Sequence, residues 1–249
     1  MENRTDKNSY TVIFATAMVV VVGAILAFLA TALKPQIDLN KKFEKQQNIL
    51  YAMGVNENDE KSVSFIPTDR VEGEFGKYIT KQLVFQGSET TEDDEAYLID
   101  LKKEAALAKN DSYERRLPLF IGEKDGKTFY IVPMRGKGLW DAVWGYIALD
   151  ESMISQGVFF DHKGETPGLG ANINQRFFMD DFTGEHILDE NGNFAGIAIS
   201  KSNADPKNER KTDNAVDAIA GATITGDGVA AMIRKDLQMY LPYLKQINN

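Results

Sequence analysis

Apolar residues are most concentrated near the amino terminus of the chain. From Asn8 through Leu33 no residue is charged, and residues 11–33 read TVIFATAMVVVVGAILAFLATAL. A helix of about 20 apolar residues crosses a bilayer, so residues 11–33 predict a transmembrane helix. Ala30-Thr31-Ala32 is similar to a signal-peptide cleavage site. The length of the apolar run favours an uncleaved anchor, because the apolar part of a signal peptide has about 7–15 residues.

The polar pattern around this span predicts a tail, a stem and a domain. Residues 1–10 form a polar tail, and Lys34-Pro35 after the span predicts a helix end. Residues 34–55 are charged with spaced apolar positions, which favours a helical stem. Residues 56–249 then form the folded domain.

Within the domain, short apolar runs bounded by glycine predict strands at residues 117–121, 128–133, 143–149, 156–160 and 194–199. Residues 89–110 begin acidic and continue with helical spacing, so the acidic residues 92–95 predict a helix amino terminus. A short helix is expected within residues 167–175. From Gly226 onward, apolar residues recur at helical spacing to the end of the chain. The expected fold class is α+β, with a mostly antiparallel sheet and flanking helices after one amino-terminal transmembrane helix.

Composition narrows the possible chemistry. The chain has no cysteine, which excludes disulfides, thiolate zinc sites, cysteine nucleophiles and ordinary iron–sulfur clusters. It has only two histidines, so haem or copper would be poorly supplied with ligands. No metal site is predicted, so an electron carrier would have to be organic. The formal net charge is −9 without a basic run, which indicates no nucleic-acid partner.

The most informative segment is DAIAGATIT, residues 217–225, which places Thr223 after small residues at a predicted helix start. Unpaired backbone N–H groups and the helix dipole make such a position suitable for a phosphate. Gly221 and Ala222 leave room for a bulky group near the backbone. The alternative is a tight turn followed by a helix that Thr223 or Thr225 caps.

This segment resembles the flavin-attachment motif of FMN-binding domains in respiratory membrane complexes. The motif has an acid, a Ser or Thr, then Gly-Ala-Thr; Asp217 matches the acid, and Ala220 replaces the first hydroxyl residue. The resemblance implies that FMN is joined through its phosphate to Thr223, with Thr225 as a second nearby hydroxyl. It also implies maturation by a separate flavin transferase that uses FAD and Mg²⁺.

The layout of the whole chain resembles the family of C subunits of Na⁺-translocating NADH:quinone oxidoreductases. The resemblance implies an electron-relay subunit that is not catalytic alone, works with other subunits, and is held in lipid of the bacterial inner membrane with its domain on the periplasmic side. Lys and Arg counts near the span favour the opposite orientation, although long domains translocate largely regardless of charge. The alternatives are the related G subunit of the ferredoxin:NAD electron-transport complex and an anchored ligand-binding module without redox activity.

Two further segments are candidates for the flavin pocket. Residues 165–170 (ETPGLG) match a family motif that lies beside the flavin ring, which implies contacts from Glu165, Thr166, Leu169 and Gly170; otherwise they form a Pro-Gly turn. Residues 136–140 (GKGLW) are similar to a Gly-x-Gly-Leu-Trp segment of the family, which implies that Leu139 or Trp140 lies against the flavin; the alternative is a loop whose Trp140 seals the core. Lys201 and Lys211 are candidates to neutralise the phosphate.

Overall fold

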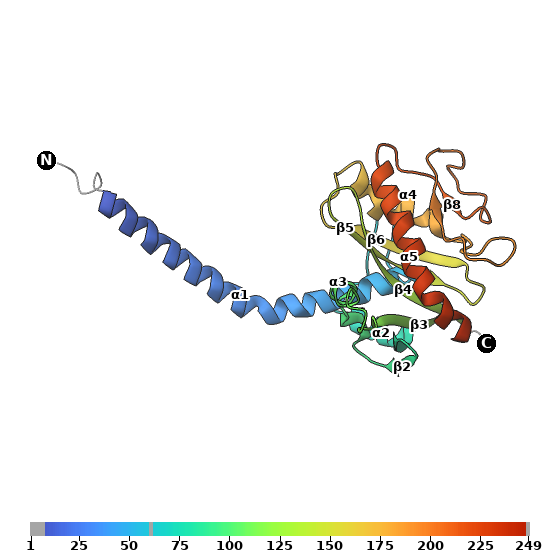
Figure 1. Ribbon diagram of the computed structural model, residues 1–249, viewed down its shortest axis with the longest axis horizontal. Coiled ribbons are helices and arrows are strands. Elements are labelled where there is room, and N and C mark those ends of the chain that lie inside the picture. Colours follow the sequence, from blue (N-terminus) through green and yellow to red (C-terminus); the bar gives the residue numbers. More distant parts are fainter. Residues whose placement is uncertain (1–7, 60–61, 248–249) are drawn as a thin grey trace. The chain divides into compact units, whose positions relative to one another are not determined.

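The computed structural model describes residues 8–59 and 62–247 and contains one long amino-terminal helix, α1 (Asn8–Ala52) (Figure 1). Residues 1–7 of the predicted tail lie outside the described residues, and residues 8–10 belong to α1. The helix end expected at Lys34-Pro35 is not observed, since Pro35 lies inside α1. A proline removes only one backbone hydrogen bond of a helix, so a helix of this length can continue through it.

The chain divides into two compact units, Met1–Lys42 and Phe43–Asn249. The first unit carries a helix that is long and apolar enough to span a membrane. The second unit includes the last turns of α1, where Ile49, Leu50 and Ala52 are fully buried. The folded domain therefore begins within the segment whose sequence predicts a stem.

A six-stranded antiparallel sheet in the order β2-β1-β3-β4-β5-β6 forms the centre of the domain. Its strands are β1 (Ile79–Gln86), β2 (Glu89–Glu92), β3 (Leu117–Lys124), β4 (Lys127–Lys137), β5 (Ala142–Leu149) and β6 (Ser155–His162). Four of them, β3 to β6, cover the strands predicted between residues 117 and 160. Together with the flanking helices, the sheet confirms the predicted α+β class.

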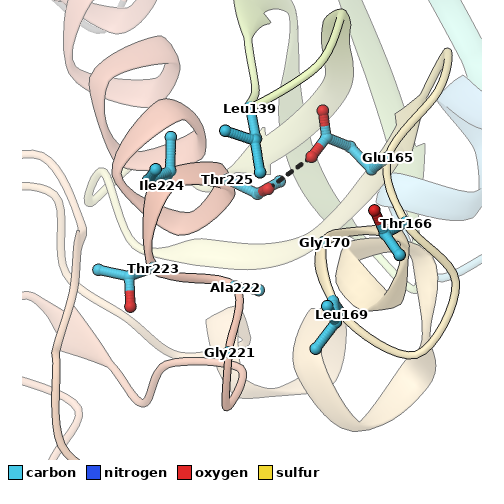
Figure 2. Close-up of a pocket in the computed structure, with 10 residues that line it drawn as sticks. All are labelled: Leu139, Glu165, Thr166, Leu169, Gly170, Gly221, Ala222, Thr223, Ile224 and Thr225. Carbon is cyan, nitrogen blue, oxygen red and sulfur yellow. Dashed lines mark hydrogen bonds between the residues drawn. The ribbon is translucent and has the colours of Figure 1, made fainter.

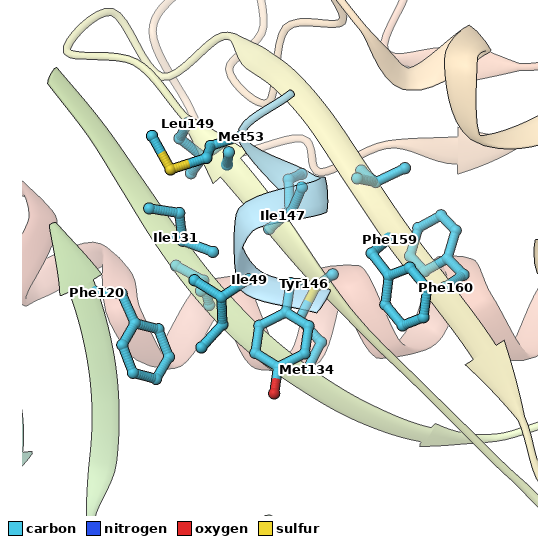
Figure 3. Packing of buried hydrophobic residues seen from close by; sticks show 14 of the residues in the cluster. Ile49, Met53, Phe120, Ile131, Met134, Tyr146, Ile147, Leu149, Phe159 and Phe160 are labelled. Carbon is cyan, nitrogen blue, oxygen red and sulfur yellow. The ribbon is translucent and has the colours of Figure 1, made fainter. Parts of the chain in front are cut away.

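Helices cover the two faces of this sheet. The end of α1 packs on one face, where Met53 lies against Gly122 of β3, and α5 (Thr223–Ile247) packs on the other, where Met232 lies against Gly136 of β4. Figure 3 shows α1 and α5 on either side of the strands, with apolar side chains between the layers. Because both faces are covered, β4 is buried along most of its length rather than at alternate positions. The Tyr240 hydroxyl donates a hydrogen bond of 2.8 Å to the Pro118 carbonyl and fixes α5 over the sheet.

The structure differs from the sequence-based expectation between residues 79 and 110. The residues from Glu89 to Glu92 form an edge strand, not the start of a helix, because Gly87 adopts a φ of +60° and turns the chain back along β1. The acidic run 92–95 is therefore not a helix amino terminus. A 3-10 turn, η2 (Ala96–Leu98), and α3 (Leu101–Leu107) follow, and Asp100 caps α3 by accepting from the Lys102 and Lys103 N–H groups. The helix α2 (Val71–Tyr78), which precedes β1, was not predicted from the sequence.

The segment between β6 and α5 has little regular structure. It contains η3 (Gly170–Asn174), α4 (Arg176–Met179) and η4 (Asp180–Phe182), and a parallel pair, β7 (Ala198–Ile199) and β8 (Ala215–Val216). Only the last two residues of the predicted strand 194–199 are in a strand. This segment brings the loop after β6 beside the start of α5.

Candidate functional site

A pocket of about 230 Å³ opens at the start of α5 (Figure 2). Residues from the loop after β4, from the loop and turn after β6, and from the start of α5 line it. The lining residues are Leu139, Glu165, Thr166, Leu169, Gly170, Gly221, Ala222, Thr223, Ile224 and Thr225. The pocket therefore joins three segments that are far apart in the sequence.

The start of α5 presents its two threonines in different directions. The Ala222 carbonyl accepts the Gly226 N–H at 2.9 Å, which begins the helix. Thr223 is exposed, whereas Thr225 is only 1% exposed and donates its hydroxyl proton to Glu165 Oε2 at 2.6 Å. The Thr225 hydroxyl is thus bonded to Glu165 and does not act as the expected helix cap. Figure 2 shows the Thr223 hydroxyl pointing away from Glu165 and the Thr225 hydroxyl pointing toward it.

Glu165 connects all three segments of the pocket. Its side chain is buried, and its Oε1 accepts the backbone N–H of Trp140 at 2.9 Å and of Asp141 at 3.4 Å, while Oε2 accepts the Thr225 hydroxyl. Burial acts to raise the pKa of Glu165. The hydrogen bonds from Thr225 and from the backbone outweigh burial and hold this pKa below its usual range. The carboxyl group is therefore ionised at neutral pH.

Glycines make room for this carboxylate. A Cβ atom at position 138 would lie 2.6 Å from Glu165 Oε1, and one at position 170 would lie 2.7 Å from Glu165 Oε2 and 2.5 Å from Thr225 Oγ1. These separations are too short for carbon and oxygen atoms. Gly138 and Gly170 are thus required for the close approach of the loops to Glu165.

Gly221 has a different requirement, because it adopts a φ of +73° in the turn before α5. A Cβ atom there would also lie 2.8 Å from Leu169 Cδ2. The turn therefore brings the backbone before Thr223 directly against the Leu169 side chain.

The walls of the pocket are apolar and partly open to solvent. Leu139, Leu169 and Ile224 are 45%, 41% and 57% exposed. Trp140 is 66% exposed, and its indole N–H donates to Thr166 Oγ1 at 3.2 Å. Trp140 therefore lies on the surface beside the pocket and does not seal the core, which was the alternative role considered for it.

Nine of the ten site residues proposed from the sequence line this pocket, and Trp140 adjoins it through Thr166 and Glu165. Sequence reasoning missed Ile224, although its place next to Thr223 was a usable signal. Lys201 lies 4.0 Å from Asp227 in the first turns of α5 and does not line the pocket. Asp217 accepts the backbone N–H of Asp205 at 2.9 Å, so it orders the loop before the pocket.

Lys211, the other lysine proposed for phosphate binding, belongs to a separate group of polar residues around the buried Glu185. Its ammonium lies 4.0 Å from Glu185 and donates to the Asp181 carbonyl at 3.0 Å. Burial raises the pKa of Glu185 to about 7 and the pKa of Asp181 to about 6. Asn208 donates to Glu185 at 2.9 Å. These residues fasten the loops before α5 but do not line the pocket.

Comparison with known proteins assigns the family. Residues 138–238 match the model of the FMN-binding domain. The C subunit of the Na(+)-translocating NADH-quinone reductase of Pseudomonas aeruginosa is 30% identical over 241 residues, which cover 90% of this chain and 89% of the relative. The chain belongs to this family of C subunits, or NqrC proteins. The corresponding protein of Neisseria meningitidis serogroup B is 27% identical over 261 residues, which cover 100% of this chain and 98% of that protein.

Solved structures of NqrC proteins have the same fold. The crystal structure of the protein from Parabacteroides distasonis has a TM-score of 0.71 and 31% sequence identity, and the match covers 85% of this chain and 96% of that one. The NqrC structure from Shewanella oneidensis, with a TM-score of 0.65 and 24% identity, agrees in fold. The match to the FMN-binding domain, residues 138–238, includes every residue that lines the pocket.

Proposed function

We propose that this chain is the FMN-carrying NqrC component of a membrane-bound Na⁺-translocating NADH-quinone reductase. Family membership and the match to the FMN-binding domain support the complex and the cofactor. The observation that carries the proposal is the pocket itself, which places an exposed threonine hydroxyl at a helix start beside apolar walls.

The residues present fit FMN. The first backbone N–H groups of α5 and its positive dipole end suit the phosphate. Gly221 allows close approach of a bulky group to the backbone, and Leu139 and Leu169 supply apolar surface for the ring system. FMN supplies the redox chemistry by accepting and donating electrons, while the protein binds and orients it.

We further propose that FMN is attached covalently to Thr223 Oγ1. Thr223 is exposed at the pocket, whereas the Thr225 hydroxyl is buried and already bonded to Glu165. Glu165 is the one ionisable side chain among the residues that line the pocket, and its hydrogen bond goes to Thr225. The pocket therefore offers Thr223 no general base, which supports modification by a separate flavin transferase. That reaction joins Thr223 Oγ1 to the FMN phosphorus of FAD and releases AMP, which takes the hydroxyl proton.

The remaining parts of the proposal concern location and partners. Residues 11–33 within α1 anchor the chain in lipid of the inner membrane, with residues 1–10 cytoplasmic and the domain periplasmic. The chain relays electrons among other subunits of the complex and binds no nucleic acid. Protease treatment of intact spheroplasts tests the orientation, because only a periplasmic domain is cleaved without lysis.

Intact-mass measurement tests the attachment site. The full chain is expressed with and without a flavin transferase, alongside the variants Thr223→Ala and Thr225→Ala. We expect the wild type and Thr225→Ala to gain the mass of FMN less one water only with the transferase, and Thr223→Ala to gain none while it stays folded. An adduct on Thr223→Ala but not on Thr225→Ala would move the site to Thr225, and an unmodified wild type would refute covalent attachment.

A further inference from the structure

We propose that the buried Glu165 carboxylate lowers the reduction potential of the flavin held in this pocket. This inference rests on the proposed function, because it needs FMN in the pocket. Glu165 is assigned as a tuning residue that acts through its charge, in addition to any contact that it makes.

The charge of Glu165 is not balanced by a cation. Its hydrogen-bond partners are the Thr225 hydroxyl and the backbone N–H groups of Trp140 and Asp141, all of which are neutral donors. Within residues 8–59 and 62–247, no ion pair to Glu165 is found. Neutral donors stabilise the ionised form of a carboxyl group but leave its net charge in place.

This charge lies where solvent screens it poorly. Glu165 is only 4% exposed, and it forms part of the pocket wall. Other carboxylates near the pocket are different, since Asp141 is paired with Lys163 at 2.8 Å on the surface. Interactions between charges are stronger in a buried site than in water, so Glu165 acts more strongly on the pocket than Asp141 does.

The position of the carboxylate is fixed. Hydrogen bonds hold both oxygens, and Gly138 and Gly170 enclose them so closely that neither glycine has room for a Cβ atom. A charge held in this way cannot turn away when the flavin gains electrons. Its effect on the flavin is therefore constant.

The effect has a defined sign. Reduction of bound FMN by two electrons, followed by uptake of one proton, leaves the ring with one additional negative charge. The Glu165 carboxylate opposes this change, so it lowers the potential. Replacement by the neutral, similarly shaped glutamine should favour reduction by about tenfold, which for a two-electron couple is a rise of about 30 mV.

A redox titration of the full chain carrying covalent FMN tests the proposal. The reductant is dithionite, reference dyes fix the potential, and flavin absorbance is the readout. We expect Glu165→Gln to raise the midpoint potential. Asp141→Asn, which removes an exposed and paired charge, should change the midpoint potential much less.

Thr225→Val provides an independent test in case Glu165→Gln fails to fold or to accept flavin. It keeps the carboxylate and removes one neutral donor, so the potential should fall or stay close to the wild-type value. A Thr225→Val potential that rises as much as that of Glu165→Gln would overturn the proposal, because disturbance of the pocket would then explain both. An unchanged potential in flavin-loaded Glu165→Gln would also overturn it, whereas a wild type that accepts no flavin would instead refute the proposed function.

Discussion

The hydrogen bond between Thr225 and Glu165 should make a measurable contribution to the stability of the domain. Thr225→Val keeps the shape of the side chain and removes the hydroxyl that donates to Glu165 Oε2 at 2.6 Å. Thr223→Val is a matched control, because it makes the same change two positions earlier on the same helix at an exposed residue.

The magnitude follows from the type of bond that is lost. Hydrogen bonds to charged groups contribute about 1.5–3 kcal/mol, and the loss of Thr225 leaves Oε2 of a buried carboxylate without its donor. For a domain of this size, that loss corresponds to a fall in Tm of about 3–12 °C. A substitution at an exposed position such as Thr223 usually changes stability by within about 0.5 kcal/mol.

The effect should also depend on pH. Because the folded-state pKa of Glu165 is below its ordinary value of 4.5, its contribution to stability is present above pH 4.5 and is lost as the pH falls through the folded-state pKa. The stability difference between wild type and Thr225→Val should therefore be largest near pH 7 and should shrink below pH 4.5.

Thermal unfolding of the detergent-purified full chain, followed by near-ultraviolet circular dichroism from pH 3 to 8, measures both effects. The flavin-free chain is used so that attachment does not alter the comparison. Equal Tm values for Thr225→Val and Thr223→Val at pH 7 would refute the reasoning. A difference that grows as the pH falls would show that Glu165 is not the partner responsible.

Three further predictions concern the same domain. Gly221→Ala should lower the stability of the domain by about 1–2 kcal/mol from the positive φ alone. In thermal unfolding it should lower Tm more than Gly126→Ala, because both glycines have a φ of +73° but only a Cβ atom at position 221 would lie 2.8 Å from Leu169. Glu185→Gln should make Tm less dependent on pH. Burial raises the pKa of Glu185 to about 7, so the folded wild type loses stability as the pH rises from about 4.5 to 7, and glutamine does not titrate. Leu169→Asp should shift the flavin absorption band without preventing attachment, and an unaltered band would remove Leu169 from the ring site.

Much of the sheet was predictable because four consecutive strands, β3 to β6, have a strong local signal. β3 to β6 are apolar runs between glycines or turns. Covered faces leave β3, β4 and β5 buried along most of their length, whereas only half of the residues of β6 are buried. The edge strand β2 has the sequence ETTE, which no local rule separates from the acidic start of a helix. Its pairing with β1 depends on the turn at Gly87 and on the presence of β1, which is tertiary information.

The site was predictable as a set of segments but not as a geometry. Sequence motifs selected the loops 136–140, 165–170 and 217–225, and the structure brings their residues to one pocket. The bond between Glu165 and Thr225 joins residues 60 positions apart, so no local pattern contains it. The same limit explains why the prediction for Lys201 and Lys211 differs from the structure. Both were chosen for their charge alone, and in the fold they lie near Asp227 and Glu185 and do not line the pocket.

The different roles of Thr223 and Thr225 nevertheless follow from helix periodicity. Successive residues of an α-helix are about 100° apart, so residues two positions apart point in nearly opposite directions. Thr225 precedes Val229 and Met232 at spacings of four and seven, and both of these are buried against the sheet. The apolar pattern of α5 therefore assigns Thr225 to the inner face, where its hydroxyl needs an internal partner, and leaves Thr223 on a different face of the helix. Glu165 is that partner, and the Thr225 hydroxyl donates its proton to it. This bond supports the proposal that Thr223, and not Thr225, is the attachment site.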